Sequence, residues 1–321
     1  MPKFKPQSLQ WPSDRAVLLV HGIGDASANG AAAFPLTQLR TAMGAGASDV
    51  AVYTLNYDFI NDWSARKLPL AAQFAAVGMA VAKQYASPEL DSTLTEYFGD
   101  ILWPVIHPDT RLAIRDAYIA QLQQIVLDCG EAALARGHDP LDYRVSIVTH
   151  SLGCFHTYEA LHAAVREPSY RLRPGTDLTQ LDTVILMASP VQLIRAISDT
   201  IKVFVPQRAQ LATLDPAGLS LPAEIMGRKR VLATRKFISV TGTQDPVGGH
   251  LLGKKSTWAF MNISGQQTEI VQQTLTEGDP KHALIAALAP GGGGAASAVQ
   301  DPHSWSAYVE REAALLAGVF A

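Results

Sequence analysis

The sequence predicts an α/β fold with a mostly parallel central sheet flanked by helices. Short, largely apolar runs at residues 16–20, 144–148 and 183–187 are typical of strands buried on both faces of a parallel sheet. Longer stretches between these runs carry apolar side chains at intervals of three and four, as on one face of a helix. Strands that alternate with helices pair in parallel through right-handed crossovers.

The composition favours one large globular domain over residues 1–321. Of the 321 residues, 48% are hydrophobic and 17% are charged, so a substantial core can form and a disordered chain is excluded. At this length one domain with insertions is favoured over two small domains. The net charge is −3 and no dense run of Lys and Arg occurs, which argues against nucleic acid as a partner.

No targeting or membrane-spanning segment is expected. Residues 1–7 contain two lysines but no apolar segment or cleavage site, so we expect a cytoplasmic protein without a signal peptide. The most apolar segment, residues 68–82, is shorter than a bilayer span and is interrupted by Pro69, Gln73 and Gly78. Cys129 and Cys154 are expected to be buried free thiols rather than a structural disulfide.

The expected elements follow one another in an order that suits such a sheet. Strands are expected at residues 16–20, 50–55, 144–148, 183–187, 236–241 and 268–275. Helices are expected at residues 31–43, 70–85, 119–133 and 154–165, and again near the C-terminus at 308–319. Helical insertions are expected at residues 56–114 and 191–231. The first insertion either covers the active site or only adds packing to the sheet.

Ser151 occupies the most informative turn of the chain. Residues 149–153 read Thr-His-Ser-Leu-Gly and lie between the strand at 144–148 and the helix that follows. A turn that sharp strains the backbone of its central residue, lifts that side chain clear of the sheet and presents the next N–H at a helix N-terminus. These features favour a nucleophilic serine, and an ordinary serine at the start of a helix is the alternative.

Two turns resemble the α/β-hydrolase superfamily. Residues 149–153 resemble its nucleophile elbow, G-x-S-x-G, with Thr149 in place of the first glycine, and residues 21–25 (His-Gly-Ile-Gly-Asp) resemble its oxyanion loop. The resemblance implies the α/β-hydrolase fold with helical cap insertions, and a serine hydrolase of the esterase or lipase type. It implies that Ser151 attacks an acyl carbonyl and that the backbone N–H groups of Ile23 and Leu152 hold the oxyanion.

The same resemblance implies a catalytic triad. Asp245 follows the strand at 236–241 and resembles the family's acid loop, although an Asp-Pro turn is also common for local reasons. The family order of nucleophile, acid and base leaves His250, His282 and His303 as candidate bases. His303 is favoured because it follows the last expected strand and precedes the C-terminal helix. In this hypothesis His303 takes and returns the proton, and Asp245 orients it.

Other chemistries compete with an ester hydrolase. The same triad would serve an acyltransferase, and thioesters and amides remain possible substrates. A non-catalytic binding protein with this fold is the second hypothesis, because a fold does not imply a chemistry. A nucleotide-binding enzyme is the third: residues 248–256 almost match a P-loop, but Lys255 stands where Ser or Thr should hold magnesium.

The remaining candidate groups are weaker. Ser189 is a poorer nucleophile because Pro190 follows it and no helix start is expected there. The histidines match no zinc-site spacing, so neither a metal nor a cofactor is expected. The expected partner is a small acyl ester or lipid-like substrate, and nothing in the sequence indicates an oligomeric state.

Overall fold

The structure is a computed structural model, and ten parts of the chain are described in it. They are residues 13–22, 49–55, 57, 108–166, 178–191, 194, 223–225, 228–242, 269–275 and 316. The helices expected at residues 31–43 and 70–85 lie outside these parts. Leu316, inside the helix expected near the C-terminus, is helical and buried.

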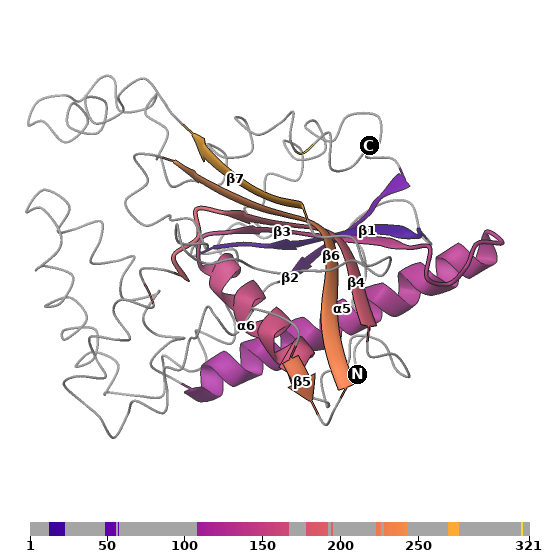
Figure 1. The fold of residues 1–321 in the computed structure, drawn as a ribbon, viewed down its shortest axis with the longest axis horizontal. Helices are drawn as coiled ribbons and strands as arrows, with labels where there is room; N and C mark the ends of the chain where they lie inside the picture. Colours follow the sequence, from indigo (N-terminus) through magenta and orange to yellow (C-terminus); the bar gives the residue numbers. More distant parts are fainter. Residues whose placement is uncertain are drawn as a thin grey trace, which may run out of the picture.

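A twisted parallel sheet forms the centre of the protein (Figure 1). Its strands lie in the order β2-β1-β3-β4-β6-β7, and every pairing along that order is parallel. The strands are β1 (Arg15–Val20), β2 (Ala51–Leu55), β3 (Arg144–His150), β4 (Leu178–Met187), β6 (Arg228–Gly242) and β7 (Glu269–Leu275). The short strand β5 (Ala223–Ile225) pairs antiparallel with the start of β6. The prediction of an α/β protein with a mostly parallel sheet is confirmed.

Two long helices cover one face of this sheet. α5 (Pro108–Ala135) and α6 (Leu152–Arg166) pack against each other, and both contact β1 and β3. A helix that leads from β2 to β3 and one that leads from β3 to β4 cross the sheet in the same direction, so right-handed crossovers place both on the same face. The large side chains buried between helices and sheet are Leu18, Tyr53, Ile114, Tyr118, Leu122 and Phe155.

α5 ends two residues beyond the helix expected at residues 119–133. Gly137 has a φ of +80°, and its N–H donates to the Leu134 carbonyl at 3.0 Å. The N–H of His138 reaches back to the Ala133 carbonyl, also at 3.0 Å. These two bonds with a left-handed glycine satisfy the last carbonyls of the helix. Residues 136–143 then connect α5 to β3.

Several elements are longer than the sequence indicates. β4 begins at Leu178 and β6 at Arg228, because the first halves of both strands pair with each other although their side chains are largely polar. α5 begins at Pro108, inside the insertion expected at residues 56–114. Likewise β5 and the start of β6 fall inside the insertion expected at residues 191–231. Apart from Tyr57, Val191 and Ile194, the rest of both insertions lies outside the described parts of the chain.

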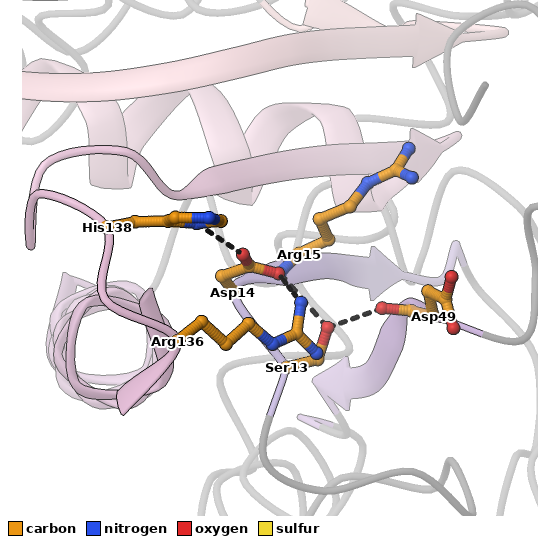
Figure 2. A network of polar contacts seen from close by, with 6 residues as sticks. All are labelled: Ser13, Asp14, Arg15, Asp49, Arg136 and His138. Atoms are coloured by element: carbon orange, nitrogen blue, oxygen red, sulfur yellow. Dashed lines mark hydrogen bonds and ion pairs between the residues drawn. The ribbon is translucent and has the colours of Figure 1, made fainter. Parts of the chain in front are cut away.

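A polar network fastens the start of β1 to the end of α5 (Figure 2). The Asp14 carboxylate lies 2.5 Å from Arg136 Nη1 and 3.7 Å from His138 Nδ1. Ser13 Oγ donates to the Asp49 carbonyl and accepts from the Arg15 N–H at 3.1 Å. This network lies at the amino ends of the parallel strands, on the opposite side of the sheet from their carboxyl ends.

Two further expectations concern the described residues. Cys129 and Cys154 are both free and buried, which confirms the prediction. Among the helices that the structure describes, none combines the length and the apolar character that a membrane span requires.

Candidate active site

The candidate site lies where the strand order reverses. From β1 the chain moves to β2 on one side and then to β3 on the other side of β1. In open α/β sheets the crevice for a ligand forms at such a switch point, outside the carboxyl ends of the strands. Gly22 follows β1 and Ser151 follows β3, and these two strands are direct neighbours. Gly22 and Ser151, one from each sequence motif, therefore lie together at this switch point.

Ser151 has a left-handed backbone. It is the single residue between β3 and α6, and its φ is +50°. A non-glycine residue in this region costs about 1–2 kcal/mol. A serine that merely capped a helix would have an extended backbone with negative φ, so the ordinary helix-start alternative does not describe this residue. Such strain concentrates at functional sites.

Neighbouring strands hold Ser151 in this conformation. Its N–H donates to the Met187 carbonyl at the end of β4, at 2.9 Å, and its own carbonyl accepts from the Cys154 N–H at 2.9 Å. The serine is 2% exposed. Leu152, which follows it, is the first residue of α6. The first N–H groups of a helix have no partner within the helix and carry partial positive charge.

Two glycines allow β1 to approach this turn closely. A β-carbon built on Gly22 would lie 2.6 Å from Ser151 Cβ and 3.2 Å from Ser151 Oγ. One built on Gly153 would lie 2.5 Å from the Val20 carbonyl oxygen and closer still to that of His21. Real β-carbons do not approach other atoms so closely, so both positions require glycine. The last glycine of the 149–153 motif thus has a structural cause.

Thr149 fits without disturbing the turn. Its side chain is fully buried, and its hydroxyl lies 3.2 Å from the Ile185 carbonyl oxygen and 3.1 Å from Cys154 Sγ. The Cys154 thiol in turn donates to the Met187 carbonyl at 3.2 Å. The departure from glycine is therefore accommodated by a small partner on α6 and by polar contacts to β4.

An aromatic cluster packs against the end of β1. The Tyr57 ring stacks on the His21 ring, with centroids 4.5 Å apart and planes 3° from parallel. The His156 ring meets Tyr57 edge-on, with centroids 4.5 Å apart and planes at 63°. The Tyr57 hydroxyl donates to the His21 carbonyl at 2.8 Å and also lies 3.1 Å from the Gly22 carbonyl oxygen.

Burial keeps this cluster uncharged. It lowers the pKa of His156 to about 3, with a smaller contribution from the nearby His21. Burial also lowers the pKa of His21, although the hydrogen bond to the Gly22 carbonyl opposes the shift. Because a carbonyl oxygen can only accept, the contact of 2.6 Å places the His21 proton on Nδ1. Burial likewise raises the pKa of the Cys154 thiol to about 12, which leaves it a poor nucleophile.

Ser189 also follows a strand, and one expectation about it is wrong. Val191 and Ile194 are helical and the Ile194 N–H donates to the Pro190 carbonyl at 2.9 Å, so a helix does start after this proline. Pro190 precedes the first helical residue, and its carbonyl accepts the first hydrogen bond of the helix. In this turn, however, the residue with the left-handed backbone is Ala188, with a φ of +53°, and not Ser189.

Three of the residues implied by the resemblance lie outside the described parts: Ile23, Asp245 and His303. The structure does describe the strands that precede the last two. His150, Met187 and Val240 pair across β3, β4 and β6, and Gly242 pairs with Leu275 of β7. The carboxyl ends of β6 and β7 therefore lie at the same edge of the sheet as Ser151. The P-loop-like residues 248–256 are also outside the described parts.

Sequence reasoning missed Tyr57. The signal that could have found it is the pairing of β1 with β2: Val20 lies opposite Leu55, which brings the residues two positions further, Gly22 and Tyr57, to the same level. That pairing cannot be read from either strand alone.

Within the described ranges, no group of His, Cys, Asp and Glu side chains could hold a metal ion. No protein-family model matches the chain, and no curated protein matches it significantly. A function must therefore be argued from the geometry at Ser151 and its neighbours.

Proposed function

We propose that the chain is a serine hydrolase of the α/β-hydrolase type that cleaves a carboxylic ester or thioester through an acyl-enzyme on Ser151. The observation that carries the proposal is the left-handed backbone of Ser151, at φ +50° between a buried strand and a helix N-terminus. Strain of this kind persists only where the surroundings enforce it, and here β1 and β4 both do so.

The reaction uses groups from four strand ends. Ser151 Oγ attacks the acyl carbon while its proton passes to His303, and Asp245 accepts the other ring N–H of that histidine. The carbonyl oxygen becomes an oxyanion held by the N–H groups of Leu152 and Ile23. The tetrahedral intermediate then expels the alcohol or thiol, which takes the proton from His303. Water releases the acyl group by the same steps, with His303 again acting as base.

The position of Leu152 and Gly22 supports the oxyanion assignment. Leu152 opens α6, where backbone N–H groups are free of intrahelical partners. Gly22 lies against the nucleophile itself, which brings the backbone that follows β1 to within reach of an acyl group on Ser151. Two N–H donors from two elements suit a tetrahedral oxyanion better than a planar ground state.

A fluorophosphonate probe tests the proposal directly. The purified chain is treated with the probe, and the adduct is counted by intact-protein mass spectrometry and located by peptide mapping. We expect one adduct on the wild-type protein and on Ser189→Ala, and none on Ser151→Ala. Circular dichroism shows whether each variant is folded. A folded wild-type protein without an adduct, or an adduct that persists in S151A, would contradict the proposal and favour a binding protein with this fold.

The substrate class follows from a second measurement. A panel of p-nitrophenyl esters from short to long acyl chains, with matched thioesters, reports which acyl group the site accepts. Product analysis in the presence of an added alcohol separates hydrolysis from acyl transfer, because only an acyltransferase gives the new ester as the main product.

A further inference from the structure

The end of β1 is held by one side chain. The Tyr57 hydroxyl lies within hydrogen-bond distance of two successive carbonyl oxygens, at 2.8 Å from His21 and 3.1 Å from Gly22. Its single proton is shared between them, while His21 Nδ1 donates a second bond to the Gly22 carbonyl at 2.6 Å. Both carbonyls are thus fixed on the side of the chain that faces Tyr57.

The contact between the Tyr57 hydroxyl and the Gly22 carbonyl oxygen also constrains the peptide that follows Gly22. In a planar trans peptide the carbonyl of one residue and the N–H of the next residue point in opposite directions. A contact that holds the Gly22 carbonyl therefore constrains the peptide to which this carbonyl belongs. Because a carbonyl is fixed on both sides of Gly22, the peptide cannot rotate without losing a buried hydrogen bond.

The ring of Tyr57 is held as firmly as its hydroxyl. It is 1% exposed, stacks on His21 and contacts His156 edge-on. Both histidines are neutral at ordinary pH because burial lowers the pKa of each. The cluster therefore gives the hydroxyl a fixed position without charge, between the end of β1 and α6.

We propose that Tyr57 is a positioning residue that orients the peptide after Gly22 as an oxyanion donor for the reaction at Ser151. The inference rests on the proposed function, because an oxyanion donor matters only if Ser151 forms an acyl-enzyme. Tyr57 does not touch the substrate. It acts through the peptide, so its removal should weaken binding of the transition state more than binding of the ester.

Tyr57→Phe tests this role, with Tyr118→Phe as the matched control. Y57F keeps the ring and its stacking and removes only the hydroxyl. Tyr118 is also a buried tyrosine, and its hydroxyl bonds to Thr157 Oγ1 at 3.0 Å, away from the carbonyls of His21 and Gly22. Both variants lose one buried hydrogen bond, so urea unfolding should show similar losses of stability.

Only Y57F should change the chemistry. We expect its kcat for the best p-nitrophenyl ester to fall by on the order of tenfold with KM within about threefold, since loss of an oxyanion donor outright costs ~10²–10³. The inhibition constant of phenylboronic acid, whose tetrahedral adduct mimics the oxyanion, should rise by the same factor. Y118F should keep the wild-type values of both.

The outcomes separate the inference from the proposed function. A wild-type protein that takes no fluorophosphonate on Ser151 overturns both. A wild-type protein that labels at Ser151, with a Y57F variant whose kcat and boronate inhibition match Y118F, overturns only the role of Tyr57. Should Y57F not fold, 4-aminophenylalanine at position 57 provides a weaker donor of the same shape. A reduced kcat then supports the inference, and a wild-type kcat overturns it.

Discussion

Gly153→Ala is the sharpest test of how the turn is built. The added methyl group would point at backbone, because the nearest atoms are the carbonyl oxygens of Val20 and His21 at the end of β1. Neither oxygen can turn aside as a flexible side chain would. Either the first turn of α6 must move away from β1, or β1 must shift within the sheet.

The size of the effect follows from the distances. The contact of 2.5 Å with the Val20 oxygen falls about 0.9 Å short of the 3.4 Å at which ordinary contacts begin. Overpacking costs roughly 1–3 kcal/mol, and a clash with backbone belongs at the upper end. The better helix propensity of alanine returns at most about 1 kcal/mol. We therefore expect G153A to lose about 2 kcal/mol of unfolding free energy.

Urea unfolding and the rate of fluorophosphonate labelling measure the result. Gly130→Ala is the control, because it is also a glycine in a helix but its β-carbon would meet only the Pro140 carbonyl at 3.1 Å. We expect G130A to be close to wild type in stability and labelling, and G153A to label about tenfold more slowly or worse, since a shift of about 1 Å misaligns the nucleophile. A G153A protein with wild-type stability and labelling would refute this account of the turn.

Three further predictions follow. Ser151→Gly should have a free energy of unfolding in urea about 0.5–1 kcal/mol higher than Ser151→Ala, because relief of ~1–2 kcal/mol of backbone strain exceeds the flexibility cost of glycine. Ala188→Gly should raise the free energy of unfolding over wild type by about the same amount. Asp14→Asn should lose about 1 kcal/mol on urea unfolding, whereas Asp116→Asn, in an exposed pair, should lose less than about 0.5 kcal/mol. The pKa of His156 is about 3 when folded and 6.5 when exposed, so the unfolded chain takes up the proton first, and stability present above pH 6.5 is lost on acidification. The loss between pH 6.5 and 5.5 is about 1 kcal/mol, and His156→Phe should remove it from the urea-derived pH profile. Equal stabilities of S151G and S151A, or of D14N and D116N, would contradict the first two predictions. An unchanged pH profile in H156F would contradict the third.

The central strands of the sheet were predictable from the sequence because they are buried. β1 and β3 are buried on both faces, so their residues form nearly continuous apolar runs that periodicity detects. The end of α5 was predictable for a similar local reason, since Gly137 supplies the left-handed residue that closes a helix. The turn at Ser151 also has a local signature, because strand, serine and helix follow one another directly in the chain.

The starts of β4 and β6 were not predictable in this way. Residues 178–182 of β4 pair with the first part of β6, which contains several Arg and Lys residues. Polar residues in a strand give no apolar run and no alternation, so each half lacks a signal of its own. What places them is the partner strand, and partners distant in sequence cannot be inferred from local propensity.

Thr149 shows which part of the elbow pattern the fold needs. The pattern places small residues on both sides of the serine, yet here the close approach is made by Gly153, which faces the end of β1, and by Gly22 just after β1, which faces Ser151. Position 149 points instead between β4 and α6, where Cys154 is small and the Ile185 and Met187 carbonyls accept hydrogen bonds. A threonine there fills space that a glycine would leave empty. A glycine is therefore required where β1 and the Ser151 turn approach each other, at Gly22 and Gly153. At position 149 the size of Cys154 on α6 decides which side chain fits.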